Sequence, residues 1–210
     1  MHLAPPPGRR MLERAGSWLA TFLLALAWLV AVPALAQGSP PDVTQLQVER
    51  TDEGLVLSAT VRFELPTVID DALAKGIPMY FVAEASVFRD RWYWYDKRVA
   101  GATRHMRLSY QPLTRRWRLQ VSSSPIGNSG LVLGQNFESR EEALAAVQRI
   151  SRWRIAEPGE VDPDTAHTVQ FRFRLDLSQL PRPFQIGAVG QSEWSIQAMR
   201  VFRLLPESPR

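Results

Sequence analysis

The sequence contains no cysteine, and this absence excludes several kinds of chemistry. Disulfide bonds, thiolate nucleophiles, thiolate metal ligands and lipid attachment at an N-terminal cysteine all require that residue. Histidine is also scarce, with 3 residues in 210. His105 and His167 lie in separate expected elements, each at a position predicted to face solvent or to begin a strand. Because a metal site needs several converging ligands, none is predicted.

Lysine is nearly absent too, since Lys75 and Lys97 are the only two and arginine carries the remaining positive charge. The formal net charge is +4 at pH 7. The basic stretch 9–14 contributes +2 of this, which leaves +2 for the rest of the chain. Nucleic-acid binding depends on many clustered contacts to phosphates, so we do not expect nucleic acid as a partner.

Recognisable catalytic motifs are missing as well. The loop 127–130 does not match the Gly-x-Ser-x-Gly elbow of serine hydrolases, and 187–190 lacks the spacing of a dinucleotide fingerprint. Glu84 is the one acid in the middle of an apolar strand, where burial can raise a carboxyl pKa, but we expect it to pair with a cross-strand arginine. The sequence therefore predicts a protein that is not an enzyme, with no catalytic residues, no metal ligands and no cofactor.

The N-terminus has the parts of an export signal. A basic stretch, 9–14, precedes the apolar run Trp18–Val32, and small residues at Ala34 and Ala36 follow Pro33. We expect residues 1–36 to be a signal peptide cleaved after Ala36, which would place the mature chain in the bacterial periplasm. The alternative is an inner-membrane anchor, because Ala15–Ala36 approaches the roughly 20 apolar residues that span a bilayer. Membrane contact is expected only in that second case.

Beyond a linker at residues 37–42, alternating apolar and polar residues predict β-strands. Val43–Thr51 and Leu55–Leu65 are expected to form a hairpin through the turn at 52–54. Met79–Phe88 has apolar residues on both faces, as expected for a strand that is covered on both sides. A bulge or bend is expected beyond Phe88, after which the chain pairs back through 96–100. The remaining expected strands are 103–110, 117–121, a short one at 154–157, 165–177 and 194–205.

Two short helices are expected in the connections. One begins at Thr67 as a possible N-cap and ends at Gly76; the other begins with a capping box of Ser139 and Glu142 and ends near Arg152. The pattern predicts a mainly β (α+β) domain over 43–205, before a tail at 206–210. Its fold is expected to be an antiparallel β-sandwich of about seven to nine strands, immunoglobulin-like in size. One curved sheet with both helices on one face is the alternative.

The segment Gly76–Arg98 combines more apolar surface and charge than any other, and it includes four consecutive aromatic residues at 92–95. These aromatics could pack within the core and hairpin, form a docking patch for a protein, or stack on envelope sugars or rest at a membrane interface. The candidate binding residues are Arg89, Arg91, Trp92, Trp94, Lys97 and Arg98.

Several short motifs, distributed over the whole expected domain, resemble one known family. They are GIPMYF at 76–81, RWYWYDK at 91–97, RLSY at 107–110, LTR at 113–115, Phe137 and QLPRPFQ at 179–185. The family consists of exported proteobacterial proteins and is defined only as a domain of unknown function. The resemblance implies no activity, cofactor or site residue. Family members are often encoded beside a membrane sensor histidine kinase of the nitrogen-regulation type, which implies an envelope or membrane sensor protein as a candidate partner.

Taken together, these patterns predict a non-enzymatic periplasmic domain that acts by binding. The first hypothesis is an interaction domain, accessory to a membrane signalling or envelope complex, that uses the surface around Arg89–Arg98. The second is a binder of a small molecule or glycan in a cleft beside that strand. The third is a hydrolase that acts through Glu84 or the loop 122–134.

Overall fold

The computed structural model describes residues 39–89, 97–127, 132–188 and 194–206. The expected signal peptide lies outside these residues, and so do Arg91, Trp92 and Trp94. Within the described part of the chain, no helix has the length and apolar character needed to cross a membrane. The described residues fall in one structural unit, Ser39–Arg210.

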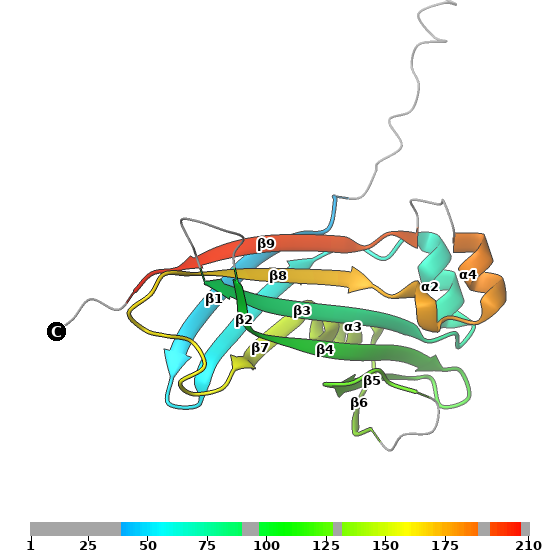
Figure 1. Cartoon of the computed structure of the whole chain (residues 1–210). Coiled ribbons are helices and arrows are strands. Elements are labelled where there is room, and N and C mark those ends of the chain that lie inside the picture. Colours follow the sequence, from blue (N-terminus) through cyan, green and yellow to red (C-terminus); the bar gives the residue numbers. More distant parts are fainter. Residues whose placement is uncertain (1–38, 90–96, 128–131, 189–193, 207–210) are drawn as a thin grey trace, which may run out of the picture. The chain divides into compact units, whose positions relative to one another are not determined.

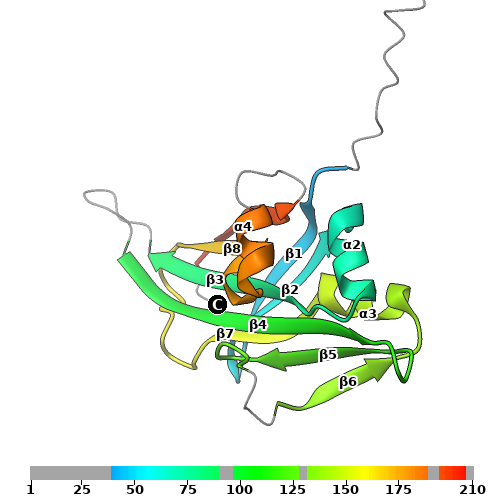
Figure 2. The ribbon, with the colours of Figure 1, turned by 90° about the vertical axis from the view of Figure 1, so that its right-hand side faces the viewer.

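The described residues form nine strands in two antiparallel sheets, which lie face to face (Figures 1 and 2). The small sheet has the order β1-β2-β7, and the large sheet has the order β6-β5-β4-β3-β8-β9. This arrangement confirms the expected antiparallel sandwich and excludes the alternative of one curved sheet. The strands are β1 Asp42–Thr51, β2 Gly54–Arg62, β3 Met79–Arg89, β4 Lys97–Gln111, β5 Arg116–Ser122, β6 Gly134–Phe137, β7 Arg149–Ala156, β8 His167–Leu175 and β9 Gln197–Leu204.

The core lies between the two sheets, because alternate residues of each strand point inward. Every second residue of β8 from His167 to Leu175 is buried, as the alternation predicts. Three phenylalanines meet in the centre: the ring of Phe63, just after β2, stacks on Phe173 of β8 at 5.4 Å between centroids. Phe81 of β3 lies 5.7 Å from both rings. These aromatic contacts join the small sheet to the large one.

The β3–β4 pair forms the middle of the large sheet, and it contains the irregularity that the sequence suggested. Val87 pairs with Ala100 but Phe88 pairs with Arg98, so Val99 is an extra residue on β4. The bulge therefore lies slightly earlier than expected, and on the partner strand. It shifts the pairing register so that Lys97 is opposite Arg89 at the end of the pair.

Three α-helices and one 3₁₀ helix lie in the described connections, one α-helix more than expected. Pro66, and not Thr67, occupies the N-cap position of α2, and no side chain caps that helix. Ser139 caps α3 as predicted, since its hydroxyl accepts the Glu142 N–H at 3.2 Å. The bounds are α2 Thr67–Ala74, α3 Arg140–Gln148, η1 Leu177–Gln179 and α4 Arg182–Ala188.

The expected end of the second helix near Arg152 is wrong. The helix α3 ends at Gln148, and β7 begins at the next residue. Pairing with β2 gives this stretch a hydrogen-bonded ladder and buries Ile150 and Trp153, which a continued helix would not achieve. The helix itself packs on β5 and β6, so it covers the part of the large sheet that the three-stranded sheet leaves open.

Candidate functional site

One end of the sandwich carries the described members of the candidate site. We call it the Arg89 end: it is where β3 stops at Arg89 and β4 starts at Lys97, opposite the end with α2 and α4 (Figure 1). The structure places Arg89, Lys97 and Arg98 together there through the β3–β4 pairing. Lys97 and Arg98 are exposed, and the Arg89 side chain is 37% exposed. The other three candidate residues lie outside the described chain.

Arg89 holds the loop between β7 and β8 through Asp162. Its Nη2 lies 3.1 Å from Asp162 Oδ2, which also accepts the Thr165 hydroxyl at 2.7 Å. The Asp164 N–H donates to the other carboxylate oxygen at 3.0 Å. The hydrogen bond from Thr165 and the one from Asp164 hold the pKa of Asp162 below its ordinary value, with a smaller contribution from the Arg89 charge. Asp162 is therefore ionised at neutral pH and fixes this loop against the end of β3.

His167 lies at the same end, opposite Arg89 in the β3–β8 ladder, and it is fully buried. Its Nδ1 is 2.8 Å from the Thr165 carbonyl oxygen, so Nδ1 carries a proton and donates it there. Its buried Nε2 has no hydrogen-bond partner in the part of the chain that the structure describes. The expectation that His167 lies on the surface is wrong, because it continues inward the alternation of Val169 and Phe171. That alternation, extended back by one step, would have predicted its burial.

The outermost cations of the Arg89 end have no carboxylate partner among the described residues. Neither Lys97 nor Arg98 forms an ion pair with any residue that the structure describes. The Arg98 Nε lies 3.5 Å from the Ala100 carbonyl oxygen, which is at most a weak hydrogen bond. In sequence, 89–98 holds four basic and two acidic residues. The end therefore presents exposed positive charge.

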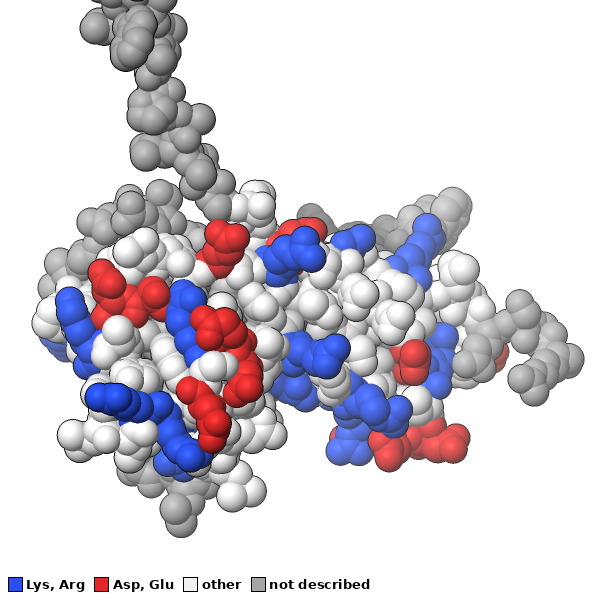
Figure 3. Space-filling view, turned by 180° about the vertical axis from the view of Figure 1, so that it is seen from behind, with Lys and Arg blue, Asp and Glu red and all other residues white. Residues whose placement is uncertain are grey.

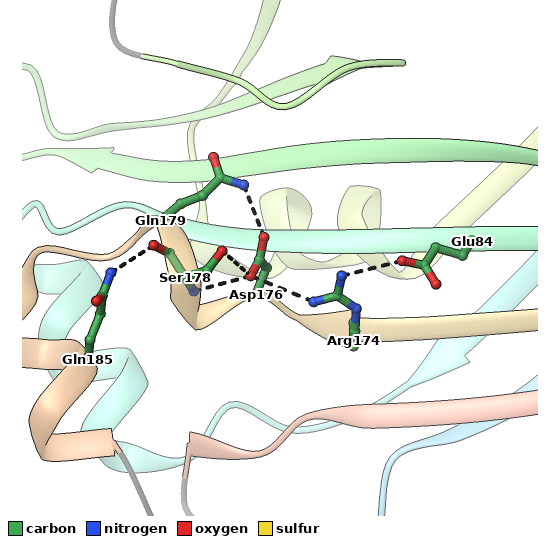
Figure 4. A network of polar contacts seen from close by, with 6 residues as sticks. All are labelled: Glu84, Arg174, Asp176, Ser178, Gln179 and Gln185. Atoms are coloured by element: carbon green, nitrogen blue, oxygen red, sulfur yellow. Dashed lines mark hydrogen bonds and ion pairs between the residues drawn. The ribbon is translucent and has the colours of Figure 1, made fainter.

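A second polar cluster lies on the outer face of the large sheet, at residues 84 and 174–179 (Figure 4). Arg174 donates to Glu84 Oε1 at 3.3 Å and lies 3.6 Å from Asp176 Oδ1, so it bridges two carboxylates. The predicted cross-strand pairing of Glu84 with an arginine is confirmed. The charge of Glu84 is therefore paired with the charge of an arginine on the neighbouring strand.

Asp176 is the most strongly bonded carboxylate of this cluster. Ser178 donates to it from its backbone N–H at 3.1 Å and from its hydroxyl at 2.7 Å, and Gln179 Nε2 donates at 3.1 Å. Burial alone would raise the pKa of Asp176, but these hydrogen bonds outweigh it and lower the pKa. Burial lowers the pKa of nearby His105, so its neutral form is favoured. The arrangement caps the 3₁₀ helix η1 and serves structure.

We expect Asp176→Asn to reduce the loss of stability in acid. A carboxyl whose folded pKa is depressed stabilises the fold above its unfolded pKa of about 4, and this contribution is lost as the pH falls through the folded pKa. Chemical denaturation at pH 7 and pH 3 should show a smaller fall in unfolding free energy for the variant than for wild type. The difference should be about 1 kcal/mol or less. Asp71→Asn, at an exposed position of α2, is the control; equal falls for Asp176→Asn and wild type would contradict the prediction.

On the face that carries the small sheet, the described residues form no comparable area of positive charge alone. Figure 3 shows basic and acidic side chains next to one another over this face. Pairs such as Arg152 with Glu53 at 3.9 Å and Arg154 with Glu157 at 3.3 Å account for part of this mixture. The described residues also contain no group of three or more His, Asp or Glu side chains that could hold a metal ion.

Comparison with known families shows to which of them the chain belongs. The model of a family described as Domain of unknown function (DUF4390) matches residues 39–204, which include every strand from β1 to β9. The chain belongs to this family. No curated protein and no solved structure matches it. The resemblance seen in the sequence is confirmed to that extent, whereas export and partner stay predictions.

Family membership brings no activity or site residues with it, so function has to be argued from geometry. Sequence reasoning located Arg89, Lys97 and Arg98 but missed Asp162 and His167. No local pattern could have paired Arg89 with Asp162, because 73 residues separate them.

Proposed function

We propose that this chain is a non-enzymatic binding domain of the bacterial envelope and that it docks on a protein partner through the Arg89 end. The partner is an envelope or membrane sensor protein that presents an acidic surface. The chain is exported by residues 1–36, which are then removed or, as the alternative, retained as an inner-membrane anchor. Binding of a glycan or small molecule at the same end is the second candidate for this surface.

One observation supports the protein partner most directly: Lys97 and Arg98 are exposed and unpaired among the described residues. Elsewhere on the described surface, Arg140 and Arg174 are matched by carboxylates, whereas exposed arginines such as Arg62 have no ion pair with a described residue. The Arg89 end differs because its two unpaired cations are consecutive in the chain and lie beside a third, Arg89. Unmatched charge on a rigid strand end attracts a surface of opposite sign and sets orientation during encounter. The Arg89–Asp162 ion pair and the β3–β4 ladder fix this strand end, so little entropy is lost when a partner binds.

A photo-crosslinking residue in place of Lys97, in living cells, tests the proposal. Position 113 is the matched control, because Leu113 is fully exposed in the turn at the other end of β4. We expect one discrete protein adduct from position 97, identified by mass spectrometry, and no such adduct from position 113. The double variant Lys97→Glu, Arg98→Glu should lower the yield of a crosslink from neighbouring Val99 by about tenfold, as charge reversal at an interface does.

Two results would count against protein docking. Glycan or lipid adducts from position 97 would favour the second candidate. The same adducts from positions 97 and 113, or none from a folded protein, would show that the Arg89 end does not bind.

A further inference from the structure

A hollow of about 310 Å³ lies between the β1–β2 turn and the loop that follows β7. Gly54 of the turn lies close to the Ala156 carbonyl and the start of that loop, so the two segments form opposite walls. Most of the lining is apolar or backbone, with one cation, Arg50, and two carboxylates, Asp52 and Glu157. The lining residues are Arg50, Thr51, Asp52, Gly54, Leu55, Glu157, Pro158, Gly159, Val161 and Pro163.

Arg50 is the unusual member of this lining. It shares the inward phase of β1 with Leu46 and Val48, so its stem points toward the core. Its Nη1 donates to the Leu205 carbonyl oxygen at 3.1 Å, but its Nε and Nη2 are buried and have no hydrogen-bond partner among the described residues. No ion pair joins Arg50 to any described residue. Because Nε and Nη2 have almost no accessible surface, a carboxylate in the hollow would contact them after the Arg50 side chain turned toward it, and the unmatched donors favour that change.

The two acidic residues of the lining are more exposed than Arg50, so their charges are screened more strongly. Asp52 and Glu157 are both exposed, and Glu157 already lies 3.3 Å from Arg154. Water and salt screen exposed charges, whereas the buried donors of Arg50 are screened much less. An anion that reached Arg50 would therefore meet a net attraction, and its apolar part would lie against Leu55 and Val161.

We infer that this hollow binds the carboxylate of a small acid that carries an apolar group. Arg50 supplies the cation, and Leu55, Val161 and Pro163 supply the apolar wall. The volume equals that of about ten water molecules and lies at the lower end of the range for small-molecule pockets, so it suits a short chain of carbon atoms. The carboxylate can come from a free acid or from the C-terminus of a peptide that ends in an apolar residue.

The Arg89 end positions one wall of the hollow. Asp162, which Arg89 and Thr165 hold, lies between two lining residues, Val161 and Pro163. The inference does not depend on the protein partner proposed above, because that partner binds at Lys97 and Arg98, and neither residue lines the hollow. A failed crosslink at position 97 would therefore not test whether the hollow binds a carboxylate.

Calorimetric titration of the full chain with sodium hexanoate tests this inference, with hexanamide as the uncharged match and sodium chloride as the ionic-strength control. We expect hexanoate to bind at least about tenfold more tightly than hexanamide, since a charged hydrogen-bond pair is lost in the amide. A peptide ending in leucine, compared with its C-terminal amide, distinguishes the peptide source from the free acid.

Arg50→Gln removes the charge but keeps an amide that can reach the Leu205 carbonyl. We expect it to weaken hexanoate binding about tenfold or more and to leave hexanamide unchanged. Arg152→Gln, an exposed arginine on the same sheet that does not line the hollow, should bind as wild type does. Equal binding of hexanoate and hexanamide to the wild-type chain would overturn the inference, even if Arg50→Gln failed to fold. So would unchanged hexanoate binding by folded Arg50→Gln.

Discussion

Replacement of Phe173 by alanine lowers the unfolding free energy by about 3–5 kcal/mol, the loss expected when a large aromatic side chain is removed from a packed core. Phe173 is fully buried, and its ring stacks on Phe63 and Phe81 at 5.4 and 5.7 Å. The change therefore leaves a cavity where the two sheets meet. Because single domains are stable by only about 5–15 kcal/mol, a large share of the total stability would be lost. Chemical denaturation followed by tryptophan fluorescence measures this change.

Two further substitutions test whether the loss of stability comes from the cavity between the two sheets. Phe173→Leu keeps most of the apolar volume and should cost less than half as much as the alanine variant. Phe184→Ala removes a phenylalanine that is only half-buried, near Trp194 with 6.4 Å between ring centroids, and should cost about 1–2 kcal/mol. If Phe173→Ala and Phe184→Ala cost the same, the three central phenylalanines do not carry the contact between the sheets.

Gly54→Ala is expected to destabilise the protein by about 3 kcal/mol or more. Gly54 ends the β1–β2 turn at a φ of +107°, a region that side chains other than glycine rarely adopt. A Cβ atom there would overlap the carbonyl oxygen of Ala156, the partner of Leu55 in the β2–β7 ladder. The backbone of β7 would have to move, and the end of the ladder with it.

Gly159→Ala separates the backbone strain at positive φ from the steric overlap with Ala156. Gly159 also has a positive φ, +80°, but a Cβ atom would meet nothing within 4 Å. It should cost only the backbone strain, about 1–2 kcal/mol. The difference in unfolding free energy between the variants measures the clash with Ala156. Equal costs would show that β7 adapts freely to an added methyl group.

The Arg89 end and the hollow beside Arg50 are linked through one loop. Asp162 pairs with Arg89 on one side and lies between Val161 and Pro163 of the hollow on the other. A substitution such as Asp162→Asn would remove the ion pair that connects the end of β3 to the wall of the hollow. The two binding activities can still be separated experimentally, because Lys97 and Arg50 belong to different sites.

Local sequence patterns predicted most of the helices and strands, but they did not predict which polar side chains come together. Alternation predicted β8 and most of β3, since a strand that borders a core needs apolar residues at every second position. The Ser139 cap was predicted because its hydrogen bond spans three residues. The end of α3 was predicted wrongly, because pairing with the distant strand β2 overrides the local preference for helix.

The sequence by itself determined the mainly β class, the positions of the strands other than β6 and β7, and the absence of thiol chemistry, since these depend on residue type and short-range periodicity. Only the tertiary structure decided that Arg89 meets Asp162 and that Arg50, beside a hollow, has donors without a partner among the described residues. Each of these depends on strands far apart in the chain. Antiparallel pairing and sheet packing bring those strands together through the summed burial of many side chains, which no local pattern encodes.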